Sequence, residues 1–334
     1  MATKIERAAR VLSRSGGGVA LRRLPTWSGL LTLCFHRIGS RGESTWERTL
    51  WDATVEELDQ RLGFLTRNAE VIAPSDLLAG EGIPGGRHVL LTFDDGYREW
   101  ATDVLSVLRA HRLSAAFFIA TGFIDRPRAP WWYEIPWMVR RSSRPGLPAS
   151  EWLATPLRFE SGRRDSASDL LLDAYKALPG DRTEPFLEWV AKESGSGRCD
   201  PDEVREDWLS WDMVRELRDA GMEIGGHTVD HPVLARLPAS EQERQIAECG
   251  RRIESELGAP MRMFSYPVGL PDSFGAEART ALERAGVRRA FGYDGGFARA
   301  GSDFDPLDLP RITGGMEREI LGATLALPQL FARW

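Results

Sequence analysis

Short apolar runs alternate with longer segments whose apolar residues recur at helical spacing along most of this chain. Two of the runs, at residues 89–91 and 115–120, contain no polar residue. Such runs are typical of strands that are buried on both faces of a parallel sheet. Further short strands are predicted at residues 30–38, 69–72, 222–224, 261–266 and 287–293. Strands that alternate with helices predict an α/β fold with a parallel sheet.

Polar residues at the predicted helix ends fit known capping patterns. Thr54 and Glu57, three apart, predict a capping box at the start of a helix striped with leucine. Ser240 and Glu243 repeat that spacing before a second helix, and Gly258 follows its last apolar residue, where a glycine commonly ends a helix. These signals place helices between the predicted strands, as a repeating (β/α) architecture requires.

The alternation breaks between about residues 125 and 207, where no clear strand is found. Residues 127–141 are rich in Pro and Trp, and helical patterns follow at residues 170–178 and 185–191. We therefore predict a helical insertion at about residues 125–207, placed after the strand at residues 115–120.

Residues with chemical potential lie where predicted strands end. Asp94 and Asp95 follow one apolar run, and His227 follows another strand. The active sites of (β/α) barrels lie at the carboxyl ends of their strands. The sequence therefore predicts a (β/α) barrel, closed or incomplete, over residues 28–334, preceded by a basic N-terminal segment at residues 1–27.

Composition and charge narrow the class of protein. A net charge of −6 over 334 residues does not indicate the strongly basic surface that nucleic-acid-binding proteins use. Three scattered cysteines are too few for a disulfide framework, and no apolar run is long enough for a transmembrane helix. No signal-peptide pattern follows the basic N-terminus, so we expect a cytoplasmic protein. The basic segment either touches anionic lipid through a weakly amphipathic face, as in a membrane-associated protein, or is simply solvated.

Asp94 and Asp95 are adjacent carboxylates, and two such anions repel each other unless a positive group lies beside them. His227 and His231, four residues apart, are the best candidates to share a cation with one of them. Two imidazoles and one carboxylate form a three-ligand catalytic metal site that leaves positions open for water and substrate. The other carboxylate is then free to act as a base.

Each of these pairs has an ordinary explanation when it is taken alone. An Asp-Asp pair is usually a solvated turn, and a His-x-x-x-His pair is often a surface pair or a packed pair. Pro232 after His231 disfavours a regular helix there, so the histidine spacing cannot rest on helix geometry. The joint occurrence of both pairs at strand ends of a barrel-like pattern favours the metal site.

Three short motifs resemble, in order, those of a known family. They are LTFDDG at residues 91–96, HTVDH at residues 227–231 and FSYPVG at residues 264–269. Over residues 30–315 the chain resembles NodB-type polysaccharide deacetylases, carbohydrate esterase family 4. The resemblance implies an incomplete (β/α) barrel that binds one divalent metal, usually zinc. The ligand set itself also tolerates cobalt, nickel or manganese. The resemblance also implies removal of N-acetyl groups from an amino-sugar-containing polysaccharide or glycan precursor, and the flanking sequence resembles the exopolysaccharide and cell-envelope branch.

Carried over onto this chain, the resemblance assigns Asp94 as the catalytic base and Asp95, His227 and His231 as the metal ligands. It also places a backbone N–H at Val268, where the tetrahedral oxyanion needs a fixed donor besides the metal. Adjacent aspartates on a turn point in different directions, so one can face the metal and the other the attacking water.

The chain departs from the family pattern at two places. The third motif usually carries an arginine near Ser265 and Tyr266, and we expect Arg311 to orient the catalytic base in its stead. Tyr266 itself is a candidate substrate contact. The late motif usually supplies a histidine as general acid, but this chain has none there. Some members instead place a histidine at the end of the first strand, and by that resemblance His36 protonates the leaving amine.

Several of these residues have a second interpretation. His36 is otherwise a packed histidine at a strand end, and Arg311 is otherwise part of a structural salt bridge. Trp131 and Trp132 in the insertion either stack on sugar rings at the rim of a cleft or pack the insertion onto the barrel.

Two other functions stay open at this point. A catalytically silent glycan-binding member of the same fold would explain the missing arginine and late histidine, but not the intact Asp94. A non-haem iron oxygenase also uses two histidines and one carboxylate as ligands, but it leaves Asp94 without a role.

Overall fold

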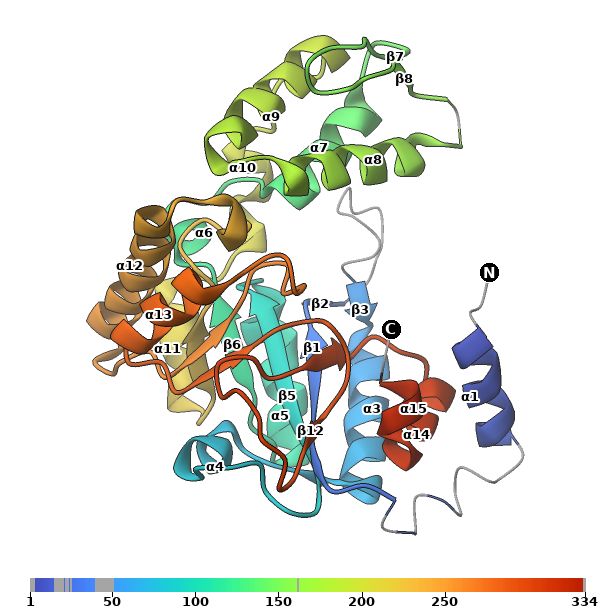
Figure 1. Ribbon diagram of the computed structural model, residues 1–334, viewed down its shortest axis with the longest axis vertical. Coiled ribbons are helices and arrows are strands. Elements are labelled where there is room, and N and C mark those ends of the chain that lie inside the picture. Colours follow the sequence, from blue (N-terminus) through green and yellow to red (C-terminus); the bar gives the residue numbers. More distant parts are fainter. Residues whose placement is uncertain are drawn as a thin grey trace.

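The computed structural model describes residues 4–14, 21, 24, 26–39, 51–160 and 162–332. Its centre is a curled sheet of nine strands (Figure 1). These strands are β1 (Gly29–Phe35), β4 (Glu70–Val71), β5 (Arg87–Asp95), β6 (Ala116–Ile119), β9 (Glu223–Gly226), β10 (Met263–Ser265), β11 (Arg289–Phe291), β12 (Ala298–Arg299) and β13 (Arg311–Thr313). Every pairing among these nine strands is parallel except that of β12 with β1.

The curled sheet closes on itself only in part. The strand order is β11-β10-β9-β6-β5-β1, with β13 also next to β1. A parallel bridge between Phe291 in β11 and Leu309, two residues before β13, links the two ends. A separate small sheet joins β2 (Arg37–Ile38) to β3 (Trp51–Ala53). The architecture is an incomplete, distorted (β/α) barrel, which confirms the predicted fold class.

Alternate residues of the strands face two different cores. Leu30, Leu90 and Phe118 belong to one buried cluster, which the alternation along β1, β5 and β6 places inside the barrel. Leu31 and Leu91, one residue further along, belong to the larger cluster that packs against the surrounding helices.

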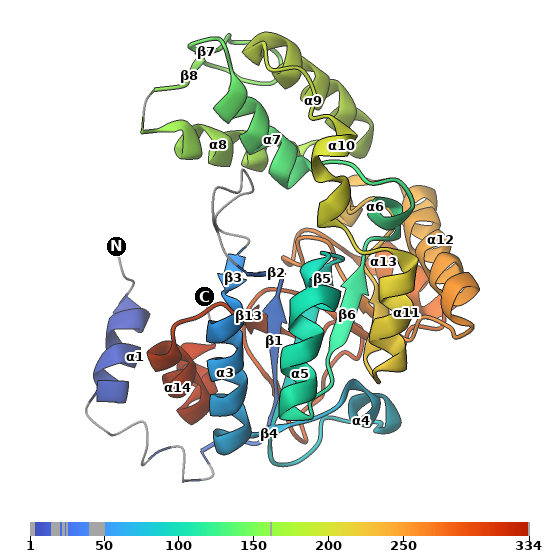
Figure 2. The same cartoon turned by 180° about the vertical axis from the view of Figure 1, so that it is seen from behind.

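The described helices around the barrel are α3 (Val55–Asn68), α4 (Pro74–Ala79), η2 (Trp100–Val104), α5 (Leu105–His111), α6 (Thr121–Asp125), α11 (Trp211–Asp219), η4 (Leu234–Arg236), α12 (Ala239–Leu257), α13 (Ala276–Arg284), α14 (Arg318–Ala326) and α15 (Pro328–Phe331). Figure 2 shows α3, α5 and α11 against the outer face of the sheet.

Two of the three predicted helix-end signals are confirmed. The Thr54 hydroxyl accepts a hydrogen bond from the Glu57 N–H at 3.1 Å, and the Glu57 carboxylate accepts one from the Thr54 N–H at 2.9 Å. Gly258 ends α12 with a φ of 67°, as a glycine cap does. The cap predicted at Ser240 is wrong, because Pro238 takes the N-cap position and Ser240 lies within the first turn.

Residues 131–160 and 162–207, which lie between β6 and β9, form a helical lobe at one end of the barrel (Figure 1). It contains α7 (Trp131–Arg141), α8 (Arg164–Ala177), α9 (Gly180–Ser194), α10 (Pro201–Val204) and η3 (Arg205–Asp207). The sequence predicted no clear strand here, but β7 (Gly146–Leu147) and β8 (Leu157–Arg158) form a small antiparallel pair. Strands of two residues are too short to leave a periodic pattern in the sequence.

The helical lobe rejoins the barrel beside Asp95. The N–H of Leu209 donates to the carbonyl of Gly96 at 2.9 Å. Arg37, directly after the first histidine of the chain, is buried and donates to the Asp207 carboxylate at 3.1 Å. The turn after β5, which carries the two adjacent aspartates, is therefore held between the barrel and the insertion.

The N-terminal helix α1 (Lys4–Arg14) packs beside α14 (Figures 1 and 2). Ala9 is fully buried, and Arg10 pairs with Glu317 at 2.9 Å, whereas Val11 is exposed. One face of the predicted basic segment is thus used in packing on the barrel. Contact with lipid and a cytoplasmic location stay predictions. Within the described ranges, no helix has both the length and the hydropathy needed to cross a bilayer.

Candidate metal centre and active site

Asp95, His227 and His231 meet at the carboxyl edge of the sheet. Asp95 is the last residue of β5, and His227 directly follows β9. The Nε2 atoms of His227 and His231 lie 3.4 Å and 3.5 Å from Oδ1 of Asp95. All three side chains are buried. The structure therefore brings together the three side chains that the sequence marks as metal ligands.

The spacing of these three ligand atoms fits a shared metal ion. Ligand atoms about 2.1 Å from a tetrahedral ion lie about 3.4 Å from one another, as the imidazole nitrogens do from the Asp95 oxygen. A charge-assisted hydrogen bond between an imidazole and a carboxylate would be shorter, at about 2.7–2.9 Å. The donor set of two imidazoles and one carboxylate suits zinc and several neighbouring divalent metals.

Different contacts fix the two imidazole rings. The Nδ1 of His227 lies 2.6 Å from the Ser265 carbonyl, so Nδ1 carries the proton and Nε2 is left as a ligand. The Nδ1 of His231 is buried and has no hydrogen-bond partner among the described residues. Instead, the Trp132 ring lies 4.2 Å from the His231 ring, and the Trp131 indole donates to the His231 carbonyl at 3.3 Å. Burial, together with the neighbouring His227, lowers the pKa of His231 to about 3, so this ring is a neutral imidazole.

Backbone strain is concentrated around this centre. Five non-glycine residues in the described part of the chain have a positive φ, and four of them surround the centre: Asp95 (95°), Thr228 (68°), His231 (55°) and Val268 (65°). Side chains disfavour this region of φ, and such strain persists where surrounding contacts hold it in place. Gln245 of α12 supplies such a contact, because its Oε1 accepts hydrogen bonds from two N–H groups of the histidine turn at 2.9 and 3.0 Å.

Asp94, the other carboxylate of the pair, is held by a different set of partners. Arg311 in β13 donates to both of its oxygens, at 2.7 and 2.8 Å, and the Ser265 hydroxyl donates to Oδ2 at 2.8 Å. Burial alone would raise the pKa of Asp94, but the Arg311 guanidinium outweighs it and holds the pKa well below its usual range. A carboxylate has about four lone-pair sites. The described partners of Asp94 use three, so one remains for the proton of a water.

His36 lies at the end of β1, facing the same edge of the sheet, with a quarter of its side chain exposed. Its Nδ1 is 3.3 Å from a carboxylate oxygen of Asp52, and its backbone N–H donates to that same oxygen at 2.6 Å. Burial lowers the pKa of His36, but the hydrogen bond and charge of Asp52 outweigh it and raise the pKa to about 9. At neutral pH the His36 ring is therefore protonated and can donate a proton.

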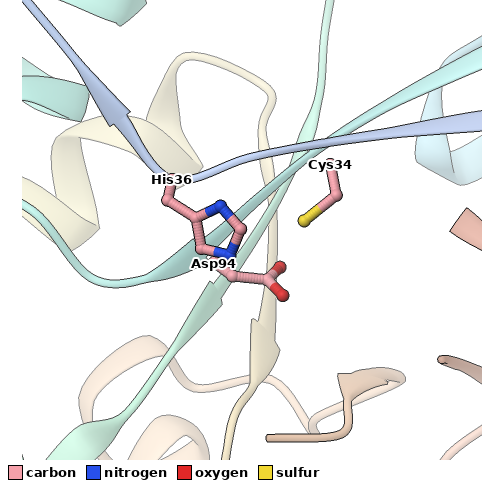
Figure 3. Close-up of side chains that lie close together, drawn as sticks. All are labelled: Cys34, His36 and Asp94. Atoms are coloured by element: carbon pink, nitrogen blue, oxygen red, sulfur yellow. The ribbon is translucent and has the colours of Figure 1, made fainter. Parts of the chain in front are cut away.

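His36 and Asp94 lie close to each other and to Cys34 (Figure 3). One potential ligand atom from each of the three lies within 4.8 Å of the others. This cluster is a poor metal site, because Arg311 already occupies both oxygens of Asp94. In addition, burial raises the pKa of the Cys34 thiol well above its usual value, so it stays protonated. The proximity matters instead because it places a protonated imidazole and a carboxylate around one point.

A hollow of about 190 Å³ opens at this edge of the barrel. All ten residues that the sequence marks as site candidates line it: His36, Asp94, Asp95, Trp131, Trp132, His227, His231, Tyr266, Val268 and Arg311. Lys176 and Tyr293, which the sequence gave no reason to single out, line it as well.

Val268 and Tyr266 contribute to this hollow in different ways. The Val268 N–H makes no hydrogen bond within the described chain, and the residue borders the hollow, so this N–H can meet a ligand atom. The Tyr266 hydroxyl donates to the Leu307 carbonyl at 2.8 Å. Tyr266 therefore offers no free hydroxyl donor to the hollow, and its ring stacks on Phe274 with ring centres 3.7 Å apart.

Trp131 and Trp132 are engaged mainly in packing. They are 9% and 7% exposed, so little of either ring is free to stack on a sugar. Trp131 stacks on Tyr175 with ring centres 4.7 Å apart, and the Trp132 indole donates to the Tyr97 hydroxyl at 3.1 Å. Of the two interpretations from the sequence, the geometry favours packing of the insertion against the histidine turn.

Three partners of the site were missed from the sequence. Ser265 was noted only as a departure from a motif, yet it contacts both Asp94 and Arg311. Asp52, whose carboxylate contacts the His36 ring, is separated from His36 in the sequence by a segment that lies outside the described residues. Lys176 comes from the insertion, whose docking no pattern predicts. Asp52 lies between Trp51 and Ala53 in β3, a strand of three residues that is too short to leave a periodic pattern, so no clear signal for it is present in the sequence.

The comparisons with known proteins agree with this architecture. The sequence model of the polysaccharide deacetylase family matches residues 81–290. YxkH, a curated relative from Bacillus subtilis (strain 168), is 23% identical over 159 residues, which make up 48% of this chain and 53% of the relative. The chain thus spans about half the length of this curated relative.

Solved structures share the fold over most of the chain. IcaB from Ammonifex degensii is 20% identical with a TM-score of 0.56, over 90% of this chain and 97% of that chain. The Streptococcus pyogenes deacetylase PplD, in complex with acetate, is 14% identical with a TM-score of 0.54, over 85% and 92% of the two chains. Fold and site define a distorted (β/α)-barrel protein with a buried centre of carboxylates and imidazoles. Because the family model covers more than half of its residues, the chain belongs to the polysaccharide deacetylase family.

Proposed function

We propose that this protein is a metal-dependent hydrolase that removes N-acetyl groups from an amino-sugar-containing polysaccharide or glycan precursor. The observation that carries the proposal is the division of labour between two adjacent carboxylates. Asp95 lies at ligand spacing from two imidazoles, whereas Asp94 is held by Arg311. This division suits hydrolysis of an amide by a metal-activated water, because one carboxylate completes the ligand set and the other is free to accept the proton of the water. Membership of the family supports the substrate class.

The metal would be held by Asp95, His227 and His231, and zinc is the ion we propose for this donor set, with cobalt, nickel or manganese as substitutes. When bound, such an ion lowers the pKa of a water and polarises the carbonyl of the acyl group. The neutral state of His231 suits this role, because a protonated imidazole has no lone pair to offer.

The remaining steps of the proposed reaction belong to side chains and backbone of this chain. Asp94 accepts the proton of the attacking water at its remaining lone pair, and Arg311 keeps the carboxylate oriented and ionised. The Val268 N–H donates to the oxyanion that forms at the acyl carbon. His36, protonated beside Asp52, transfers its proton to the departing amine of the sugar.

Metal analysis combined with acetate assays on a panel of N-acetylated oligosaccharides tests the proposal. We expect about one divalent ion per chain, acetate release in the absence of oxygen, and loss of release after chelation with recovery on adding zinc. Turnover that depends on oxygen would point to the iron oxygenase alternative. Sugar binding without release from any acetylated glycan would favour the silent binding module.

The pKa of His36 predicts an alkaline limit for turnover. A general acid must be protonated, so turnover should fall as the pH rises through about 9. Asp52→Asn removes the charge that raises this pKa, and the limit should shift towards the ordinary value of about 6.5. The raised pKa of His36 also affects stability, because the folded protein holds this proton more tightly than the unfolded chain. The His36–Asp52 pair therefore stabilises the fold fully below pH ~6.5 and loses that contribution as the pH rises through about 9. His36→Ala should lower turnover by about 10²- to 10⁴-fold with the metal retained.

A second His–Asp pair provides a matched control for this experiment. His111 pairs with Asp59 at 2.8 Å on the surface of α5 and α3, away from the hollow. His111→Ala and Asp59→Asn should leave both the rate and its alkaline limit unchanged. Unchanged turnover in His36→Ala would remove His36 from the mechanism and leave it as a packed strand-end residue.

A further inference from the structure

Tyr97, which has no part in the proposed reaction, lies two residues after Asp95 and is fully buried. Several contacts fix its ring. Trp208 stacks on it with ring centres 5.2 Å apart, and the Arg37 guanidinium lies 4.7 Å from its ring centre. The backbones of Tyr97 and Trp208 also form an antiparallel bridge. These contacts determine where the phenol oxygen of Tyr97 points.

The Tyr97 hydroxyl has two hydrogen-bond partners, and their chemistry fixes the direction of both bonds. The indole nitrogen of Trp132 lies 3.1 Å from the phenol oxygen, and an indole N–H can only donate. The second partner is the carboxylate of Asp95, which as an anion can only accept. The hydroxyl therefore accepts a hydrogen bond from Trp132 and donates its single proton to Asp95. Burial, followed by the charge of Asp95, raises the pKa of the Tyr97 phenol well above its usual value, so this proton stays on the oxygen.

Trp132 connects this contact to a second proposed metal ligand. Its ring lies 4.2 Å from the ring of His231, whose Nδ1 has no hydrogen-bond partner among the described residues. A metal-binding imidazole is ordinarily held by a hydrogen bond at its second nitrogen, as His227 is held by the Ser265 carbonyl. His231 lacks that bond, so packing against Trp132 fixes its ring instead. Trp132 is in turn held edge-on by Phe123, with ring centres 5.8 Å apart.

We propose that Tyr97 and Trp132 form one positioning unit for two of the three metal ligands, Asp95 and His231. This inference rests on the proposed function, because it takes these two side chains as ligands. Tyr97 belongs to the turn after β5, and Trp132 belongs to α7 of the helical lobe, so the unit is complete only when the lobe is docked on the barrel. The lobe thereby contributes to the affinity for the metal, although all three proposed ligands come from the barrel.

Tyr97→Phe tests the unit with the smallest change, because it removes only the hydroxyl and keeps the ring. The dissociation constant for zinc, measured on the metal-free protein by competition with a chromophoric chelator, should rise about 10- to 100-fold. Trp132→Phe removes the indole N–H and part of the surface against His231, and it should raise the constant by a similar factor. Because the two residues act together, the double variant should weaken binding by less than the product of the two single factors.

Two other residues of the helical lobe provide matched controls. Tyr175 is buried and its hydroxyl hydrogen-bonds Thr183, and the Trp137 indole in α7 donates to Glu203 at 3.3 Å. Tyr175→Phe and Trp137→Phe make the same chemical changes, and both should keep the wild-type affinity for zinc. Wild-type affinity in Tyr97→Phe, or a loss of affinity that both controls share, overturns the positioning unit.

A spectroscopic measurement separates positioning of the ligands from general stability. The visible absorption bands of a bound cobalt ion report the geometry of its ligands, and a hydroxyl that only stabilises the fold leaves them unchanged. Tyr97→Phe should change the position or intensity of these bands in the cobalt-loaded protein, whereas Tyr175→Phe should not. Wild-type bands in Tyr97→Phe overturn the positioning unit alone. A wild-type protein that binds neither zinc nor cobalt rejects the proposed function itself, so the two failures are distinguishable.

Discussion

Asp94→Asn should lower kcat by about 10²- to 10⁴-fold while the metal content stays at the wild-type level. Asparagine keeps the size of the side chain and can still accept a hydrogen bond from Arg311, but it cannot take up a proton. The ligand atoms of Asp95, His227 and His231 are separate from this carboxylate, so their geometry need not change. Acetate release and metal content, measured on the same preparation, check both halves of the expectation.

A second aspartate with a similar arginine partner is the control for this substitution. Asp125, at the end of α6, also accepts hydrogen bonds from one arginine on both of its oxygens, with Arg252 as the donor at 2.8 and 2.9 Å. It lies outside the hollow, and Asp125→Asn should leave kcat unchanged. Loss of metal in Asp94→Asn would instead make Asp94 a ligand, and retention of most of the activity would remove it as the base.

The ligand group could be predicted from the sequence because Asp95 and His227 each lie at the end of a recognisable strand. The apolar run before Asp94 and Asp95 marks a buried strand, and parallel strands bring their carboxyl ends to one edge. The same rule brings His227 to that edge, although β6 and the whole insertion lie between the two segments in sequence. Strand order then places β5 and β9 on either side of β6, close enough for the ligand atoms to meet.

Contacts that depend on the register of distant strands could not be predicted in this way. Ser265 reaches Asp94 only because β10 and β5 face each other across the barrel interior. The sequences of these two strands do not predict that arrangement. Arg311 was foreseen only as a substitute for a missing arginine, whereas its pairing with Asp94 follows from the position of β13 beside β1. β13 has three residues, so no periodic pattern marks it as a strand.

The insertion shows a related limit of sequence reasoning. Its aromatic residues suggested a sugar-binding rim as readily as packing, because both uses select the same residue types. In the structure the Trp132 ring packs against the His231 ring, and the Trp131 indole donates a hydrogen bond to the His231 carbonyl. The lobe therefore contacts the candidate metal centre itself. A region added to the barrel thereby takes part in positioning a residue of the barrel motif.

Arg311→Met should reduce the free energy of unfolding by about 3–5 kcal/mol and also lower kcat. The guanidinium is 1% exposed and donates two hydrogen bonds to Asp94, so its removal leaves a buried carboxylate without a counter-charge. Such a loss is larger than that of a surface ion pair, because water cannot replace the missing partner. Denaturation by urea measures the stability, and acetate release on the same sample measures the rate.

The double variant Asp94→Asn with Arg311→Met separates the buried charge from simple loss of packing. It removes both charges, so it should regain part of the stability lost in Arg311→Met while remaining inactive. Arg262→Met serves as the surface control, because Arg262 pairs with Glu223 at 2.6 Å but is about half exposed, and its loss should cost only about 0–1 kcal/mol. If Arg311→Met were no more destabilising than Arg262→Met, Asp94 would have to be solvated or already neutral. A neutral Asp94 could not act as the ionised base that the proposed hydrolysis requires.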